Sequence, residues 1–423
     1  MSTVTIGILG ILFLFILLAM RMQIGFSMAL VGFLGFAVLG SLKPSFIILG
    51  MEPFKIGAAY SLSVIPLFIL MGQFANTSKM GFEIYQTVYR WIGFLPGGLS
   101  MATIGACAGF AAISGSSLAA AATMGMVALP EMKRFKYDDS LATGCIAAGG
   151  TLGILIPPST VMIIYGMLTE QPIATLFIAG ILPGILLCVL FMLSIYIMAR
   201  LKPALGPPGP KFTMKEKIYS LKDTWSILCL FILVIGGLYT GWFTPTEAAG
   251  VGAFGAFVIT IIKRRLTWDN LTTALSDTTR TTAMVFLILI GAHILGYFLA
   301  ISQIPDQLSI LAAESGLNNY IVLALLIFAY IVLGCFMEGL AIMVLTIPIV
   351  YPMVLDMGFD PIWFGVIITL VMEMSLITPP VGINVFIISG IAKEVPMYTI
   401  FRGILPFWFA ILVCIIFLVI FPQ

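Results

Sequence analysis

The chain has 423 residues, of which 61% are hydrophobic and 9% are charged, and its mean hydropathy is +1.16. Soluble domains carry roughly 25% charged residues, so this chain has too little polar surface to cover a globule in water. A single histidine and the absence of CxxC spacing argue against zinc or haem, and nothing in the net charge of +2 supports a nucleic-acid partner. Composition therefore predicts an all-α protein that crosses a membrane several times.

Apolar runs of membrane-spanning length recur along the whole chain. The first has no positively charged segment before it and no small-residue cleavage site, so we expect a membrane helix rather than a cleaved signal. The runs lie at residues 4–20, 24–41, 61–76, 94–130, 139–167, 174–199, 225–241, 247–262, 282–300, 320–355, 361–391 and 399–421.

Two of these runs are about twice the length of one span. Run 94–130 breaks at SGSS, residues 114–117, and run 320–355 breaks at MEGL, residues 337–340. Small and polar residues at mid-run suit a re-entrant helical hairpin, although two full spans would leave the flanking loops on the same sides. We expect about ten transmembrane helices and two such hairpins.

Basic residues set the expected orientation. They concentrate in the loops around residues 200–222 and 263–280, whereas the loops around 168–173, 240–246, 301–319 and 356–361 contain no Lys or Arg. Cytoplasmic loops carry the excess of basic residues, which predicts periplasmic termini in a bacterial inner membrane. Only Lys43 and Lys55 fall on the other side.

A series of landmarks recurs at a nearly constant spacing. Pro157–Pro158 matches Pro379–Pro380, and Ser116 in the first break matches Glu338 in the second at the same spacing. An odd number of expected crossings separates corresponding elements, so the second copy should be inverted relative to the first. Inverted repeats with broken helices are the architecture of secondary transporters.

The repeat divides the chain into five parts. They are N-terminal scaffold helices (1–60), a first repeat (61–199, with hairpin 94–130 and broken helix 139–167), a cytoplasmic basic loop (200–224), scaffold helices of the second half (225–281), and a second repeat (282–421, with hairpin 320–355 and broken helix 361–391).

Half-helices at the breaks expose backbone groups that bind ions. Carbonyl groups at C-terminal ends suit Na⁺, and N-terminal ends suit a carboxylate. Small residues also serve tight helix packing, and that interpretation stays open for each one taken alone. The candidate residues are Ser114, Gly115, Ser116, Ser117, Gly149, Gly150, Thr151, Gly153, Pro157, Ser159 and Thr160 in the first copy, and Met337, Glu338, Gly339, Glu373, Ser375, Thr378, Pro379, Gly382 and Asn384 in the second.

Four charged or titratable residues stand out by position. Glu338 and Glu373 are the deepest acids, and insertion of each costs at least about 2.5 kcal/mol. They suit cation coordination, substrate binding or a structural hydrogen bond. His293 suits either a pH sensor or a buried neutral side chain, and Arg402 is either interfacial or close to the site.

The pairing of LGILIPPS with LITPPVGIN, the Gly-Ser-rich first break and the overall length resemble one known family across essentially the whole chain. This family is the large membrane subunit of tripartite ATP-independent periplasmic (TRAP) transporters. The resemblance implies an elevator-type fold and Na⁺-coupled uptake of an organic acid, a C4-dicarboxylate or sialic acid, with no organic cofactor. It also implies two partners, namely a small four-helix membrane subunit as a separate chain and a periplasmic substrate-binding protein.

The resemblance further implies the roles of the site residues. One sodium site would use Ser114, Gly115, Ser116, Gly149, Thr151 and Gly153, and the other Met337, Gly339, Ser375, Thr378 and Gly382. The substrate would contact Ser116, Ser117, Pro158, Ser159, Thr160, Glu338, Pro380 and Asn384. Related ion transporters have Ser-Asn-Thr tips in place of SGSS and MEGL, so the resemblance does not fix individual coordinating atoms.

Other functions remain as alternatives. A stand-alone organic-anion symporter would need no binding protein, and a passive channel would not need duplicated ion-type sites. An intramembrane lipid-modifying enzyme would need clustered acid and base residues, which the isolated Glu338, Glu373 and His293 do not supply. No GxxxxGK[ST] motif occurs, so ATP-driven transport has no support.

Overall fold

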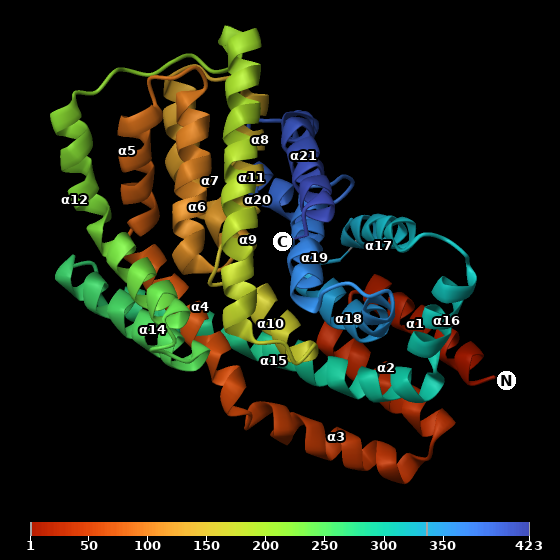
Figure 1. Cartoon of the computed structure of the whole chain (residues 1–423). Coiled ribbons are helices and arrows are strands. Elements are labelled where there is room, and N and C mark those ends of the chain that lie inside the picture. The colour runs from red at the N-terminus through yellow and green to blue at the C-terminus, as the bar shows by residue number, and fades with distance from the viewer. Residues whose placement is uncertain (1, 336, 423) are drawn as a thin grey trace.

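The computed structural model describes residues 2–335 and 337–422, and this part of the chain forms helices and no β-strand (Figure 1). The first half contains α1 (Thr3–Ala19), α2 (Ile24–Leu39), α3 (Leu42–Gly57), α4 (Val64–Thr77), α5 (Met80–Ile92), α6 (Gly98–Ser114), α7 (Ser117–Arg134), α8 (Asp139–Gly150), α9 (Leu152–Leu155), α10 (Thr160–Leu168) and α11 (Ile173–Leu201). The second half contains α12 (Met214–Phe231), α13 (Gly237–Tyr239), α14 (Pro245–Ile262), α15 (Trp268–Ser302), α16 (Ile304–Glu314), α17 (Asn319–Gly334), α18 (Gly339–Asp356), α19 (Pro361–Ser375), α20 (Ile383–Ile391) and α21 (Met397–Ile420).

Helix length and composition confirm a multi-span membrane protein. Among the described residues, 6 helices are long and apolar enough to cross a membrane, or up to 8 if each of two bent pairs is one span. One bent pair is the first proline-broken helix, α8–α9 with α10, which bends by 42°. The expected total of about ten crossings also depends on shorter helices such as α1 and α2 and stays a prediction.

The first double-length run breaks where the sequence predicts, and the second breaks a few residues earlier than predicted. α6 ends at Ser114 and α7 begins at Ser117, while α17 ends at Gly334 and α18 begins at Gly339. At 1.5 Å per residue, the 17 residues of α6 extend only about 25 Å, which is less than the ~30 Å hydrocarbon core. α1 has the same length, however, and α18 is one of the six helices long enough to span, so the two re-entrant hairpins stay a prediction.

Corresponding helices of the two repeats follow each other in the same order. The first residues of α7 and α18, Ser117 and Gly339, are as many residues apart as the last residues of these helices. The two proline pairs have the same separation. Asp138, which caps α8, and Asp360, which caps α19, share this spacing, and each side chain accepts a hydrogen bond from an N–H of the first turn. These matches support the duplication, whereas its inversion across the membrane stays a prediction.

Several helices extend beyond the apolar runs. α15 begins at Trp268 rather than near residue 282, because Thr267 caps a polar first half. α12 begins at Met214, inside the segment 200–224 that the sequence predicts as a loop, behind a Thr213–Glu216 capping box. The structure also contains α3, α5 and α16, where the sequence predicts no span. Polar or charged side chains interrupt the apolar character of these segments, so hydropathy alone does not detect them as helices.

A close helix crossing joins the two repeats. A Cβ atom at Gly403 on α21 would lie 1.9 Å from the Ser140 carbonyl oxygen, and one at Gly144 on α8 would lie 2.5 Å from the Gly403 backbone. Only glycine allows the two backbones to approach so closely. α21, from the second repeat, therefore lies directly against the broken helix of the first (Figure 1).

We expect Glu83→Gln to destabilise the protein by about 1–3 kcal/mol. Glu83 on α5 pairs with Lys263 and, at 3.7 Å, with Arg265, and the Glu83 and Lys263 side chains are only 15% and 14% exposed. Removing the carboxylate leaves two partly buried cations without this partner. Thermal unfolding in detergent measures the loss.

The matched control for this prediction is Glu394→Gln. Glu394 pairs with Lys133 at 2.7 Å, but its side chain is 85% exposed, so its loss should leave the unfolding midpoint nearly unchanged. Equal shifts for the two variants would contradict a structural role for the Glu83 pairs.

Candidate functional site

The first hairpin tip presents the start of α7. Gly115 ends α6 with a φ of 58°, a conformation that strains other residues, and Ser116 caps α7 by accepting a hydrogen bond from Ala119 N at 3.3 Å. The chain therefore reverses within two residues, and the N-terminal end of α7, with its partial positive charge, lies at the tip.

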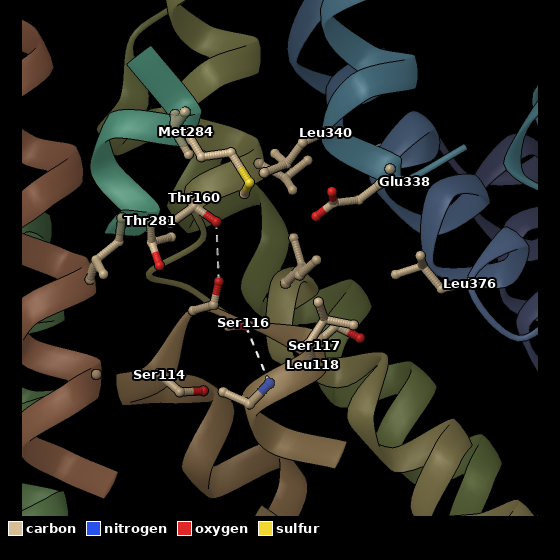
Figure 2. A pocket seen from close by; sticks show the side chains of 18 of the residues that line it. Ser114, Ser116, Ser117, Leu118, Thr160, Thr281, Met284, Glu338, Leu340 and Leu376 are labelled. Atoms are coloured by element: carbon tan, nitrogen blue, oxygen red, sulfur yellow. Dashed lines mark hydrogen bonds between the residues drawn. The ribbon is translucent and has the colours of Figure 1, made fainter. Parts of the chain in front are cut away.

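This tip packs directly against the first proline-broken loop. A Cβ atom at Gly153 would lie 2.5 Å from the Ser116 carbonyl oxygen, and one at Gly115 would lie 2.7 Å from the Pro158 carbonyl oxygen. Thr160 Oγ1 donates a hydrogen bond to Gly115 O at 3.3 Å (Figure 2). The structure thus brings together the tip and the loop that the sequence pairs.

Three other predicted residues of the first loop make local contacts. Thr151 donates to Ala148 O at 2.6 Å, and Ser159 caps α10 by accepting from Met162 N at 3.2 Å. A Cβ atom at Gly149 would lie 2.8 Å from a sulfur atom on α6. These contacts hold the two half-helices in place, and the Thr151 oxygen retains lone pairs that a cation can use.

The second tip makes comparable contacts with the second loop. Cys335 Sγ lies 3.2 Å from the Pro379 carbonyl oxygen and donates to it, and a Cβ atom at Gly334 would lie 2.0 Å from Ser375 Cβ. Glu338 is the N-cap of α18 but forms no side-chain capping bond, so its carboxylate points elsewhere. Each tip therefore lies on the proline-broken loop of its own repeat.

The hydroxyl groups of the second loop donate to their own helix. Ser375 Oγ donates to the Met372 carbonyl at 2.6 Å, and Thr378 Oγ1 to the Met374 carbonyl at 2.6 Å. Gly382 caps α20 with a φ of 57°. The Ser375 oxygen is thus left to act as an acceptor or cation ligand, whereas Thr378 Oγ1 already accepts a hydrogen bond from Trp408 Nε1 at 3.0 Å.

A cavity of about 440 Å³ lies between the two tips. Glu338 points from the second tip toward the side of Ser116 and Thr160 (Figure 2). The described lining residues include three carboxylic acids, Asp277, Glu338 and Glu373, and no Lys, Arg or His. An anionic ligand would therefore need cations or helix N-termini to bind here.

The structure divides the predicted site residues into two groups. Those that line the cavity are Ser114, Gly115, Ser116, Ser117, Thr160, Glu338, Gly339 and Glu373. Those outside the cavity lining, in the broken helices and their loops or in the second tip, are Gly149, Gly150, Thr151, Gly153, Pro157, Pro158, Ser159, Met337, Ser375, Thr378, Pro379, Pro380, Gly382 and Asn384.

The sequence of the chain also matches a known family. The model of the tripartite ATP-independent periplasmic transporter DctM component matches residues 11–423. The chain belongs to this family, the TRAP large permeases. It is thus a subunit of a membrane transporter and not an enzyme, so the lipid-modifying alternative is wrong.

Relatives of this TRAP permease are named for different substrates. It is 36% identical over 377 residues to the C4-dicarboxylate TRAP transporter large permease protein DctM of Pseudomonas aeruginosa, covering 89% of this chain and 87% of the relative. It is 32% identical over 365 residues to the sialic acid TRAP transporter large permease protein SiaM of Vibrio cholerae, covering 86% and 85%.

A solved structure shares the fold of this TRAP permease. MtrF of Neisseria gonorrhoeae, described as illuminating a class of antimetabolite efflux pumps, aligns with a TM-score of 0.60 over 89% of this chain and 83% of MtrF. The identity is 13%, so the likeness concerns the fold alone. It confirms that the TRAP permease has a membrane-transporter fold.

Two helices outside the predicted sites also contribute polar groups to the cavity of this TRAP permease. Gln73 and Asn76 project from α4, and Asp277 and Thr281 project from α15. Spacings of three and four residues place each pair on one helix face. The sequence signal for them is a pair of polar residues one turn apart, at the edge of an apolar run.

His293 and Arg402 lie outside the lining of this cavity. His293 Nδ1 lies 2.9 Å from the Leu289 carbonyl oxygen one turn earlier on α15, which fits a structural side chain. Arg402 lines a separate cavity with Asp138 and Lys202, near the start of α8 and the end of α11. Arg402 is therefore separate from the cavity, and His293 is half-buried, so its role stays a prediction.

Proposed function

We propose that this TRAP permease couples the uptake of an organic acid to an inward Na⁺ gradient through an elevator movement. The two relatives described above are named for C4-dicarboxylate and for sialic acid, which are both organic acids. The substrate class is therefore a carboxylate-bearing molecule of modest size, and either kind is compatible with a cavity of about 440 Å³.

The observation that carries the proposal is the convergence of helix N-termini on the cavity. Ser117 begins α7, Gly339 begins α18 and Thr160 begins α10, and all three line the cavity. Aligned peptide dipoles give each such end about half a positive charge, which favours a carboxylate. Substrate would be held by these ends and by Ser116, Ser117, Thr160 and Glu338, with Pro158, Ser159, Pro380 and Asn384 behind them.

The charge of the cavity supports sodium coupling. Three acidic side chains and no basic side chain among its described lining residues repel an organic anion unless cations bind with it. Oxygen atoms at the contacts between tips and loops suit Na⁺, a hard cation. The first site would use Ser114, Gly115, Ser116, Gly149, Thr151 and Gly153, and the second Met337, Gly339, Ser375, Thr378 and Gly382.

The arrangement of the walls supports an elevator movement. Hairpins and broken helices form one side of the cavity, and α4 and α15 form the other. A site at this boundary can move together with the hairpins and broken helices, past α4 and α15.

We also propose two partners, a separate small membrane subunit and a periplasmic binding protein. The permease would lie in an inner membrane with both termini in the periplasm.

Reconstituted uptake tests this function. Liposomes that contain the permease and the small subunit, with substrate-loaded binding protein outside, should accumulate the organic acid only under an inward Na⁺ gradient. Uptake that is unchanged when choline replaces Na⁺ would overturn the coupling. Equal uptake without the binding protein would favour the stand-alone symporter instead.

A further inference from the structure

A buried carboxyl group joins the two repeats behind the cavity. Glu373, on α19 of the second repeat, is fully buried and contributes to the cavity wall. Its Oε2 accepts a hydrogen bond at 3.2 Å from the hydroxyl of Ser117, the first residue of α7 in the first repeat. The two residues are 256 positions apart in the chain.

Asn384 completes a three-residue cluster around the same serine. Its Nδ2 donates to Ser117 Oγ at 2.9 Å and to the Ala147 carbonyl at 3.3 Å. Because Ser117 Oγ accepts from Asn384 and donates to Glu373, its hydrogen-bonding roles are fixed. Ser117, Glu373 and Asn384 are each fully buried.

Two oxygen atoms of this cluster have no partner. Glu373 Oε1 and Asn384 Oδ1 are buried and accept no hydrogen bond from any described residue. When Glu373 is ionised, both oxygens are acceptors only, so neither can satisfy the other directly. The cluster therefore has two unpaired acceptor oxygens and no hydrogen-bond donor or cation of the described chain to satisfy them, which is costly in a buried site.

No basic side chain among the described residues pairs with the Glu373 carboxyl group. The ion pairs formed by described residues do not include Glu373. A buried carboxylate without a cation is strongly unfavourable, and an acid at membrane depth is by default a candidate functional group. One carboxylate with neutral oxygen ligands matches the charge of a monovalent cation, whereas sites for divalent cations usually contain several carboxylates.

We propose that Glu373 and Asn384, held by Ser117, bind a Na⁺ ion through Glu373 Oε1 and Asn384 Oδ1. This site is additional to the two sodium sites at the tips, and the inference rests on the proposed Na⁺ coupling. It moves Asn384 from substrate binding to cation binding. A cation here ties the start of α7 to α19 and α20, so that the two repeats close around the cavity only when it is bound.

Sodium-dependent thermal stability of the purified full-length permease tests the proposal. The unfolding midpoint is measured against NaCl concentration at constant ionic strength with choline chloride. Wild-type protein should gain stability cooperatively, whereas Glu373→Gln should require about tenfold or more Na⁺ for the same gain, with a Hill coefficient lower by about one. Glu394→Gln, an exposed Glu-to-Gln change, should behave as wild type.

The outcomes separate this inference from the proposed function. If wild-type protein does not respond to Na⁺, both are overturned. If wild type responds and Glu373→Gln responds identically, the additional site is overturned while sodium coupling stands. This last result is the one expected if Glu373 carries a proton, because glutamine mimics the neutral acid.

A direct count of bound ions covers the case in which Glu373→Gln does not fold. Equilibrium binding of radioactive ²²Na⁺ to wild-type protein and to Asn384→Ala should show one ion fewer in the variant. Equal counts at saturating Na⁺ would overturn the site. A variant that binds one ion fewer but still unfolds cooperatively would support it.

Discussion

Replacing Gly153 with valine should reduce uptake by about tenfold or more, because a displaced tip raises the barrier to transport. A Cβ atom there would lie 2.5 Å from Ser116 O and 2.9 Å from Ser117 Cα, and both are backbone atoms that cannot rotate away. Overpacking of this kind costs about 1–3 kcal/mol or more. The first tip must therefore shift away from the broken helix.

Gly390→Val is the matched control for this prediction. Gly390 lies on α20, and a Cβ atom there meets nothing within 4 Å. Its uptake should remain near wild type. If Gly153→Val transports normally, the contact between tip and loop is not part of the transport site.

Replacing Gly403 with valine should destabilise the whole permease by about 3 kcal/mol or more. A Cβ atom there would lie 1.9 Å from Ser140 O, so the α8–α21 crossing cannot form as described. Since this crossing holds the first broken helix against the second repeat, we expect both a lower unfolding midpoint and lost uptake. Fluorescence-detected size exclusion after heating measures the midpoint.

Gly296→Val on α15 is the control for this second prediction. A Cβ atom at Gly296 also meets nothing within 4 Å, so added volume faces open space. The variant should unfold at the wild-type temperature. An equal loss of stability in both variants would show that valine disturbs any helix of this permease, regardless of packing.

The breaks in the helices were predictable because their signals are local. Gly115 and Ser116 end one helix and cap the next, and the proline pair removes backbone donors, so each break follows from a few adjacent residues. The constant spacing between the two copies is equally visible in the sequence, and the ends of α7 and α18 follow it. Family membership also followed from these motifs.

The contents of the site were only partly predictable, because contacts between distant residues have no local signal. Nothing near Ser117 in the chain indicates that it bonds Glu373 and Asn384, which meet it through the packing of α7 against α20 and of α9 against α19. Likewise, Asp277 and Thr281 belong to the polar half of α15, which lies outside the apolar run. Hydropathy locates spans but does not say which helix faces meet.

Access to Ser116 from each side of the membrane tests most directly whether the cavity between the tips is an alternating transport site. Ser116→Cys is placed in a background in which the 6 native cysteines are replaced by alanine, and membrane-impermeant thiol reagents are added to right-side-out and to inside-out vesicles. We expect labelling from both faces, with substrate and Na⁺ together protecting the cysteine. Labelling from one face only, under every condition of substrate and Na⁺, would show that this cavity is not an alternating transport site.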